Sequence, residues 1–336
     1  MKKIAIAGFG TVGGGIAHLL HDNQAVLAAN AGENISLGAI LVRTMKADSE
    51  FAHLMTTDFT TIEQDEDICL VAEAIGGVDV PFEIACRTLK AGKGFVTANK
   101  ALVAEKGHIL HALAKEHNVP FLFEAAVGGG MPIIRPIRTS LSSTGINYVY
   151  GILNATSNFI LSEMDKGSTY NEAVKEAQAR GYAEADPSAD VDGIDSARKL
   201  AIILSMITGK QTSPDDIRTV GITALKDTCG GKVKLLARAA VKADGVHAEV
   251  SPVLVGDDNL MTCVKSDRNG IVIRGEGSVE TAFFGVGAGA IPTASAVLSD
   301  VVEAIRRPVY SDECAWGADK LNVLPWTDSE LAEYRS

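Results

Sequence analysis

The sequence lacks any long run of hydrophobic residues. No stretch of its 336 residues approaches the roughly 20 consecutive apolar residues that a transmembrane helix needs. The start, Met1-Lys2-Lys3, is followed by apolar residues, but glycines and then His18 and Asp22 interrupt them, so no signal-peptide core forms. We therefore expect a soluble, cytoplasmic protein without a membrane partner.

Runs of Lys or Arg are also absent. The chain has 31 basic and 42 acidic side chains, which gives a formal net charge of −11. Nucleic-acid phosphates would be repelled by such a protein unless it had a concentrated basic face. We therefore expect no nucleic-acid partner.

The cysteines lack the spacing of a disulfide framework or a zinc site. None belongs to a CxxC pair, and none has a histidine at metal-ligand spacing. An odd number of scattered cysteines predicts reduced thiols in a reducing compartment. The five are Cys69, Cys86, Cys229, Cys263 and Cys314.

Short β-rich runs alternate with helical patterns in the first third of the chain. This alternation predicts βαβ units and a parallel sheet covered on both faces. The predicted strands are Lys2–Ala7, Ile35–Val42, Cys69–Ala74, Gly94–Thr97 and Val119–Glu124. The predicted helices are Val12–Leu20, Phe82–Lys90 and Val103–Asn118.

The alternation stops at Gly128-Gly129-Gly130, and we place a domain boundary around residues 130–145. The pattern beyond it predicts a mixed sheet with helices on one face. Strands are predicted at Tyr148–Leu153, Val246–Val255, Gly270–Arg274 and Glu280–Val286, and helices at Asn171–Arg180 and Ile194–Ile207. A last helical pattern, Ala294–Arg306, is expected to return to the first domain.

The segment Gly8-Phe9-Gly10-Thr11-Val12-Gly13 is a GxGxxG sequence between a predicted strand and a predicted helix. Dinucleotide binding requires this context, because the turn brings the pyrophosphate close to the backbone and to the positive end of a helix. A glycine-rich turn without a ligand is the alternative, and the strand–turn–helix context favours the cofactor. The predicted cofactor-binding residues here are Gly8, Gly10, Thr11, Val12 and Gly13.

The second predicted strand runs into Arg43, and no acidic residue follows until Asp48. A carboxylate at this position would bond the ribose 2′-hydroxyl of NAD, whereas an arginine accepts the 2′-phosphate of NADP. Arg43 therefore favours NADP(H). A solvated loop cation is the alternative, and use of NAD stays open.

Together these patterns predict an α/β protein of two domains. Residues 1–135 would form an N-terminal Rossmann-type parallel-sheet domain that binds NAD(P), completed by a helix from about 290–310. Residues 136–289 would form a mixed α+β domain. Residues 311–336 would form a C-terminal tail.

The predicted helix Ile194–Ile207 is almost entirely apolar but carries Asp195 and Lys199, four residues apart on one face. Such pairs are usually surface ion pairs worth about 0.3–0.5 kcal/mol. A surface pair does not account for an apolar helix, and a buried ionisable pair is costly unless it has a task. Asp195 and Lys199 are therefore candidate catalytic residues.

Residues 177–199 resemble the signature of homoserine dehydrogenases, A-x3-G-aromatic-A-x2-D-P-x2-D-aliphatic-x-G-x-D-x3-K. Every defined position is present from Ala177 to Lys199. The family usually has glycine where Ala155 stands, which leaves the local backbone geometry open. Further similar segments are Thr97–Lys100, Glu124–Pro132, Asn154–Leu161, Lys232–Ala239 and Gly285–Ala294, so the resemblance covers about residues 1–310.

The resemblance implies an NAD(P)-dependent enzyme that interconverts L-homoserine and L-aspartate-4-semialdehyde in threonine, methionine and isoleucine biosynthesis. It also implies a homodimer, with residues 136–289 as the substrate-binding and dimerisation domain. It implies that Lys199 donates the proton with Asp195 as its partner at the substrate hydroxyl. Lys100, after a predicted strand, would lie between cofactor and substrate. Whether Lys199, Lys100 or a water is the immediate donor stays open. Glu184 and Asp190, together with Asp195 and Lys100, would bind the amino-acid substrate.

Three further segments are assigned to ligands. Thr97 and Lys100 are predicted to contact the cofactor, as is Gly287 at the head of the returning helix, where a tight turn without a ligand is the alternative. The segment from Glu124 resembles the family's site for a monovalent cation such as Na⁺. Its ligands would be the Glu124 carboxylate and the carbonyls of Val127, Gly129 and Met131. A glycine-rich hinge with a solvated glutamate is the alternative.

Two other functions stay open at this point. The chain could be another NADP-dependent oxidoreductase of amino-acid metabolism, of the aspartate dehydrogenase or saccharopine reductase type, or a non-catalytic NADP-binding sensor. A semialdehyde dehydrogenase that uses a thiol is disfavoured, because no cysteine stands in a recognisable nucleophile setting with a paired histidine. The Asp195–Lys199 pair speaks against the sensor.

The segment after about residue 310 is far too short for the ACT regulatory domain that many members of the resembled family carry. We therefore expect that threonine does not inhibit homoserine oxidation by feedback through such a domain. Initial rates measured over a threonine titration check this expectation, and strong cooperative inhibition would contradict it.

Overall fold

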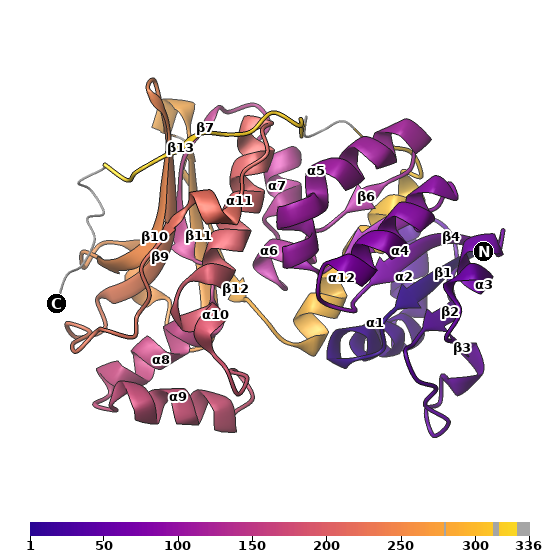
Figure 1. Ribbon diagram of the computed structural model, residues 1–336, viewed down its shortest axis with the longest axis horizontal. Helices are drawn as coiled ribbons and strands as arrows, with labels where there is room; N and C mark the ends of the chain where they lie inside the picture. Colours follow the sequence, from indigo (N-terminus) through magenta and orange to yellow (C-terminus); the bar gives the residue numbers. More distant parts are fainter. Residues whose placement is uncertain (279, 312–315, 328–336) are drawn as a thin grey trace. The chain divides into compact units, whose positions relative to one another are not determined.

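The computed structural model describes residues 1–278, 280–311 and 316–327 (Figure 1). The chain forms two compact units. Among the described residues, unit 1 comprises those of Met1–Ile134 and Ala288–Ala318, and unit 2 comprises those of Arg135–Gly287 and 319–327. The chain therefore passes out of unit 1 within the interval where the glycine cluster predicts a boundary, and it re-enters unit 1 before the last helix.

Unit 1 is built on a six-stranded sheet with the strand order β3-β2-β1-β4-β5-β6. All neighbouring strands are parallel. This is the Rossmann order, and it confirms the predicted fold of the N-terminal part. The order reverses between β1 and β4, so their carboxyl ends form the switch point where ligands bind in such sheets. The strands are β1 Lys2–Ala7, β2 Ile35–Leu41, β3 Met55–Thr56, β4 Ile68–Glu73, β5 Gly94–Thr97 and β6 Phe121–Leu122.

The returning helix α12 belongs to the core of unit 1. It packs beside α1 (Figure 1), and a Cβ on Gly15 of α1 would lie only 3.1 Å from the carbonyl oxygen of Ala290. Ile6, Ile16 and Val297 share one buried apolar cluster. The helices of unit 1 are α1 Thr11–Asp22, α2 Gln24–Ala31, α3 Phe59–Gln64, α4 Asp79–Lys90, α5 Lys100–His117, α6 Ala125–Gly128 and α12 Ala290–Arg306, with a 3₁₀ turn η1 at Ala52–Leu54.

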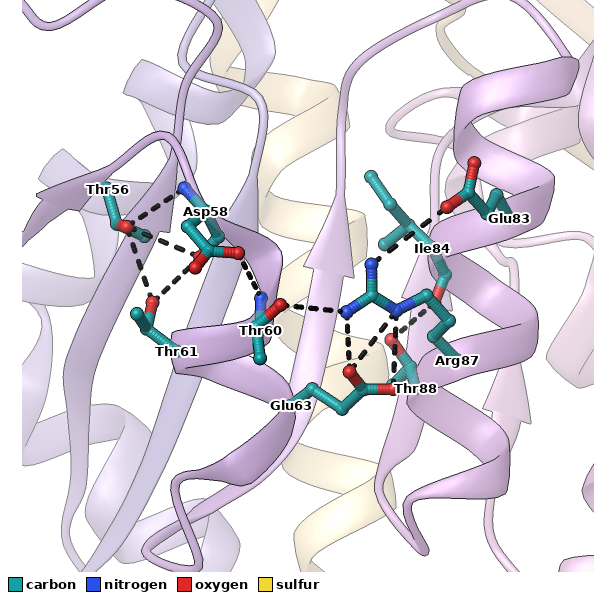
Figure 2. Close-up of polar contacts among 9 residues, drawn as sticks. All are labelled: Thr56, Asp58, Thr60, Thr61, Glu63, Glu83, Ile84, Arg87 and Thr88. Carbon is teal, nitrogen blue, oxygen red and sulfur yellow. Dashed lines mark hydrogen bonds and ion pairs between the residues drawn. The ribbon is translucent and has the colours of Figure 1, made fainter.

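A polar cluster joins α3 to α4 (Figure 2). The guanidinium of Arg87 on α4 donates to Glu63 Oε2 on α3 at 2.5 Å and to the hydroxyl of Thr60 at 3.3 Å. Asp58 caps the start of α3 by accepting a hydrogen bond from the Thr60 amide. The Glu63 and Arg87 side chains are half-buried, so the cluster fixes α4 against α3.

Unit 2 is built on a mixed seven-stranded sheet, as the sequence predicts. The order is β12-β11-β7-β9-β10-β13, and β8 also pairs with β10. The neighbours from β12 to β10 are antiparallel, whereas β8 and β13 run parallel to β10. The strands are β7 Ile146–Ile152, β8 Arg218–Thr219, β9 Val233–Lys242, β10 Gly245–Leu254, β11 Arg268–Gly275, β12 Glu280–Val286 and β13 Val323–Leu324.

Helices α8 and α11 pack against this sheet. The signature segment contains two helices, because Gly193 adopts φ +82 between α10 and α11, a conformation that favours glycine. The helix that begins just after Asp186-Pro187 is the short α10, and α11 is a separate helix that begins at Ile194. The helices are α7 Ile134–Arg138, α8 Ala155–Asp165, α9 Tyr170–Ala179, α10 Ser188–Val191 and α11 Ile194–Thr208, with 3₁₀ turns η2 Pro214–Asp216, η3 Leu260–Cys263 and η4 Glu276–Ser278.

The segment after residue 310, predicted as a separate tail, is divided between the two units where the structure describes it. Trp316 is buried in unit 1, where a Cβ on Gly107 of α5 would lie 2.4 Å from its ring. Val323 and Leu324 form β13 and pair with β10 in unit 2. Cys314 lies outside the described residues.

No helix in the described ranges is both long enough and apolar enough to span a bilayer. Of the described cysteines, Cys69, Cys86 and Cys263 are free thiols.

Strand β9 carries a lysine in the interior of unit 2. Lys234 is 2% exposed, and its Nζ donates to the carbonyl of Val264 at 3.0 Å. Burial lowers the pKa of Lys234 from 10.5 to about 8, because the charged form loses hydration. Between these two pH values the unfolded chain binds more protons than the folded chain, so stability rises with pH.

We therefore expect wild type to gain stability relative to Lys234→Met as the pH rises from about 8 towards 10.5, by about 1–3 kcal/mol in total. Urea unfolding of both proteins across this range measures the difference. Lys242→Met, which changes an exposed lysine at the end of the same strand, is the control. A difference between wild type and Lys234→Met that does not change with pH would contradict the expectation.

Candidate active site

The glycine turn of unit 1 follows β1 and begins α1. Gly8 adopts φ +97, and a Cβ on it would lie 2.7 Å from the carbonyl oxygen of Ala74. A Cβ on Gly13 would lie 2.0 Å from the carbonyl oxygen of Gly8, so α1 packs directly on the turn. A Cβ on Gly10 would meet no atom within 4 Å, which leaves its backbone open to a ligand. These are the three roles that glycines have in a dinucleotide fingerprint.

The first turn of α1 is suited to an anion. Thr11 and Val12 are the first two residues of the helix. The N-cap residue Gly10 has no side chain that could accept hydrogen bonds from the backbone amides of this first turn. Amides at such a helix end are available to a phosphate, which the helix dipole also attracts.

A cavity of about 880 Å³ lies at the carboxyl ends of β1, β2 and β4. This volume falls within the roughly 300–1,000 Å³ range of ligand pockets. The cavity therefore fits a dinucleotide at the switch point of the sheet. It is lined by Gly8–Gly10, Leu41–Thr44, Lys46, Thr57, Ala74–Pro81 and Ile84.

Two cations belong to this lining. Arg43 is exposed at the end of β2, where the sequence predicts a 2′-phosphate contact. Lys46 follows three residues later, and its Nζ donates to the carbonyl of Phe9 at 2.6 Å and lies 5.2 Å from the centroid of the Phe9 ring. Sequence reasoning missed Lys46, although a second cation so close to Arg43 was a usable signal.

The first residues of α1, Thr11, Val12 and Gly13, are not part of this lining, and neither are the predicted cofactor contacts Thr97, Lys100 and Gly287. Thr97 is fully buried, and its hydroxyl is bonded within the protein to Glu73 and to the Asn99 amide. Lys100 is the first residue of α5 and is half-buried. Gly287 follows β12 in unit 2, where a Cβ would lie 2.0 Å from the side chain of Asn269. The cofactor contacts of these three residues remain predictions.

Unit 2 holds the candidate catalytic pair. Helix α11 buries both Asp195, 2% exposed, and Lys199, 7% exposed. The Nζ of Lys199 lies 2.9 Å from Asp195 Oδ2 and donates to the carbonyl of Leu153 at 2.6 Å. Leu153 directly follows β7, so the end of that strand and the first turns of α11 together fix the ammonium group.

Asn154 links this pair to a second carboxylate. It caps α8, since its Oδ1 accepts from the Ser157 amide at 2.7 Å. Its Nδ2 donates to Asp195 Oδ2 at 2.9 Å and to Asp190 Oδ1 at 2.6 Å. Sequence reasoning missed Asn154, although an asparagine directly after a predicted strand is a strong helix N-cap signal.

The structure brings some of the predicted substrate residues together but not all of them. Asp190, Asp195 and Lys199 belong to one hydrogen-bonded group with Asn154. Glu184 lies exposed in the loop between α9 and α10, outside this group as far as the described contacts go. Ala155 is the first residue of α8 and has no positive φ, so the position does not require the family's glycine.

The arrangement of this group would allow it to exchange a proton with a polar ligand. A buried ammonium held by a carbonyl and a carboxylate has a fixed position, as a general acid requires. The carboxylate of Asp190 suits a cationic amino group, while that of Asp195 is engaged with Lys199. A buried ion pair rarely repays its desolvation by stability alone, so its placement here favours a functional role.

The predicted cation segment folds around Glu124. The Oε1 of Glu124 accepts from the amides of Ile133 and Ile134 at 2.5 and 2.8 Å, and Asp300 accepts from the Glu124 amide at 2.7 Å. Glu124 is 3% exposed, so the solvated glutamate of the alternative interpretation is wrong. The carboxylate fixes the turn that contains Gly129 and Met131.

Within the described residues, no three His, Cys, Asp or Glu side chains gather as a metal site. The predicted cage depends instead on carbonyl oxygens of Val127, Gly129 and Met131, so it remains a prediction.

Family models match most of the chain. A model described as the NAD binding domain of homoserine dehydrogenase matches residues 8–124, and one described as homoserine dehydrogenase matches residues 132–302. The homoserine dehydrogenase of Pseudomonas aeruginosa is 40% identical over 99% of this chain and 80% of its own length. The enzyme of Lactococcus lactis is 38% identical over 91% of this chain and 74% of its own length.

Solved structures agree. A homoserine dehydrogenase from Thiobacillus denitrificans superposes with a TM-score of 0.90 at 36% identity, covering 96% of this chain and 79% of that one. A hyperthermophilic archaeal homoserine dehydrogenase, solved in complex with NADPH, has a TM-score of 0.78 at 28% identity, covering 93% of this chain and 100% of that one. The chain therefore belongs to the homoserine dehydrogenase family of NAD(P)-dependent oxidoreductases.

Proposed function

We propose that this chain oxidises L-homoserine to L-aspartate-4-semialdehyde and catalyses the reverse reduction, with Lys199 exchanging the proton. Bound NADP(H) supplies the hydride in one direction and accepts it in the other. The Nζ of Lys199 takes the hydroxyl proton during oxidation and returns it to the carbonyl oxygen during reduction. Asp195 and the Leu153 carbonyl hold Nζ in position.

The observation that carries this proposal is the buried group around Asn154. It unites a proton-exchanging amine with two carboxylates in a helix that is otherwise apolar. Asp190 and Glu184 hold the substrate ammonium, and Asp195 stands with Lys199 at the substrate hydroxyl. Lys100 at the start of α5 is a second cation for the substrate and cofactor.

NADP is the proposed cofactor, with NAD as a second possibility. The exposed side chains of Arg43 and Lys46 in the cavity lining suit the 2′-phosphate, and no acidic side chain ends β2. The archaeal relative that binds NADPH supports this choice. A monovalent cation held by Glu124 and the carbonyls of Val127, Gly129 and Met131 is part of the same proposal.

We further propose that the protein is a cytoplasmic homodimer and that it acts in threonine, methionine and isoleucine biosynthesis. Cys69, Cys86 and Cys263 are free thiols, as in a reducing compartment. Strand β12 lies at the end of the sheet order, and its Phe284 is 50% exposed, so this sheet edge favours a second copy as partner. Light scattering coupled to size-exclusion chromatography tests the dimer.

A rate assay tests the activity itself. Reduced nicotinamide absorbance is followed with homoserine and each oxidised cofactor, and with aspartate and saccharopine as the substrates of the alternative functions. We expect turnover with homoserine. Turnover with aspartate or saccharopine instead, or binding of NADP without any turnover, would contradict the proposal.

Replacing Lys199 by alanine removes the proposed proton exchange. We expect kcat to fall by about 10²–10⁴-fold, while the affinity for NADPH stays close to wild type because unit 1 forms the dinucleotide cavity. Steady-state rates and fluorescence titration with NADPH measure the two effects. Lys210→Ala, just beyond the end of α11 and exposed, is the matched control. Retention of more than about a tenth of the activity would argue against the assignment.

Replacing Arg43 or Lys46 by alanine removes a proposed 2′-phosphate contact. We expect the KM for NADP to rise about tenfold in each variant, since a charge-assisted hydrogen bond contributes about 1.5–3 kcal/mol. The KM for NAD, which has no 2′-phosphate, serves as the internal control and should change little. Equal changes for both cofactors would show that neither side chain discriminates between them.

A further inference from the structure

A fully buried acid stands at the carboxyl end of β4, next to the dinucleotide cavity. Glu73 is the last residue of the strand and is 0% exposed. The cavity wall begins with the next residue, Ala74, and continues through Ile75, Gly76 and Gly77. Sequence reasoning did not assign any role to this acid, because the predicted strand Cys69–Ala74 includes it as an ordinary strand residue.

Both oxygens of Glu73 accept hydrogen bonds from groups that shape the site. Its Oε1 accepts from the amide of Ile75 at 2.6 Å and from that of Gly76 at 3.3 Å. Its Oε2 accepts from the hydroxyl of Thr97 at 2.5 Å. Burial raises the pKa of Glu73, and these donors oppose that rise. The carboxyl group is therefore committed to the protein's own groups and does not face the ligand.

The network continues to the loop that carries Lys100. The hydroxyl of Thr97 accepts from the amide of Asn99 at 2.9 Å. The Nδ2 of Asn99 donates to the carbonyl of Gly77 at 2.7 Å, while its Oδ1 caps α5. These bonds close a ring from Glu73 to Thr97, Asn99, Gly77 and back along the chain.

This ring holds the wall in a conformation that most residues avoid. Gly76 and Gly77 adopt φ +85 and +73, and a Cβ on either would meet no atom within 4 Å. Glycine is thus required by the backbone conformation and not by space. Because the amides of Ile75 and Gly76 turn inward to Glu73, the wall depends on the carboxyl group beneath it.

We propose that Glu73 is a positioning residue for the cofactor, which fixes the cavity wall at Ile75–Gly77 and, through Thr97 and Asn99, the start of α5. This inference rests on the proposed function, because NADP(H) is the ligand whose binding it explains. Glu73 exchanges no proton with the substrate and touches no reacting atom.

The test compares Glu73→Leu, Glu73→Gln and Thr97→Val in the full chain. Glu73→Leu leaves two amides and a hydroxyl without their acceptor, so the Kd for NADPH and the KM for NADP should rise about tenfold or more. The KM for homoserine should change much less. Glu73→Gln keeps an acceptor for both amides and a polar partner for Thr97, so it should restore affinity to within about threefold of wild type.

Thr97→Val keeps the volume of the side chain and removes only the hydroxyl that links Glu73 to Asn99. It should weaken NADPH binding in the same direction as Glu73→Leu, and it keeps the proposal testable if the leucine variant does not fold. Glu66→Leu, an exposed glutamate near the other end of β4, is the control and should bind NADPH as wild type does. Far-UV circular dichroism and thermal unfolding verify that each variant is folded.

The outcomes separate this inference from the proposed function. If folded Glu73→Leu and Thr97→Val bind NADPH as tightly as wild type, the positioning role is wrong and the proposed function is untouched. If Glu73→Gln loses as much NADPH affinity as Glu73→Leu, the positioning role is also wrong, because the negative charge of Glu73 would then matter more than its hydrogen bonds. If wild type neither binds NADPH nor oxidises homoserine, the proposed function fails and this inference fails with it.

Discussion

The structure of the candidate active site depends on keeping one ammonium group out of water. Lys199 lies in an apolar helix, so its charge must be matched within a few ångströms by the Leu153 carbonyl and the Asp195 carboxylate. The hydrogen bond from Lys199 to the Leu153 carbonyl joins the end of β7 to the start of α11. Asn154 then ties Asp195 to Asp190 while capping α8, so one asparagine orders the beginnings of three helices.

In unit 1, backbone amides shape two walls of the dinucleotide cavity. The glycine turn at Gly8 and Gly13 lets α1 pack on its own strand, and the turn amides stay available for a phosphate. On the other side of the switch point, Glu73 draws the amides of Ile75 and Gly76 inward. One wall therefore offers its amides to the ligand, and the other commits them to a buried carboxyl group.

Much of this could be predicted from the sequence, where local patterns are strong. The GxGxxG turn and the alternating elements predicted the parallel sheet, and the charged pair in an apolar helix predicted a buried Asp195–Lys199 couple. Strand β9 was missed, since Lys234 and Arg238 suggest solvent-facing positions although both are buried. No alternation of apolar and polar residues then marks the strand.

The remaining features depend on partners that are distant in the sequence. Glu73 is identified as a positioning residue only when Thr97 is seen to donate to it from β5. Trp316 docks on Gly107, and β13 pairs with β10, so the last described residues belong to the two units instead of forming a tail. The cation cage around Glu124 stays a prediction, because residue types do not show where carbonyl oxygens point.

The central claim is that the Lys199 amine itself exchanges a proton with the substrate oxygen. Chemical rescue tests it most directly: primary amines of graded basicity are added to Lys199→Ala, and homoserine oxidation is measured. The account predicts that small amines restore turnover, with a rate that follows the basicity of the amine. If no amine restores turnover although the variant still binds NADPH and homoserine, the proton passes through another group, and the claim is contradicted.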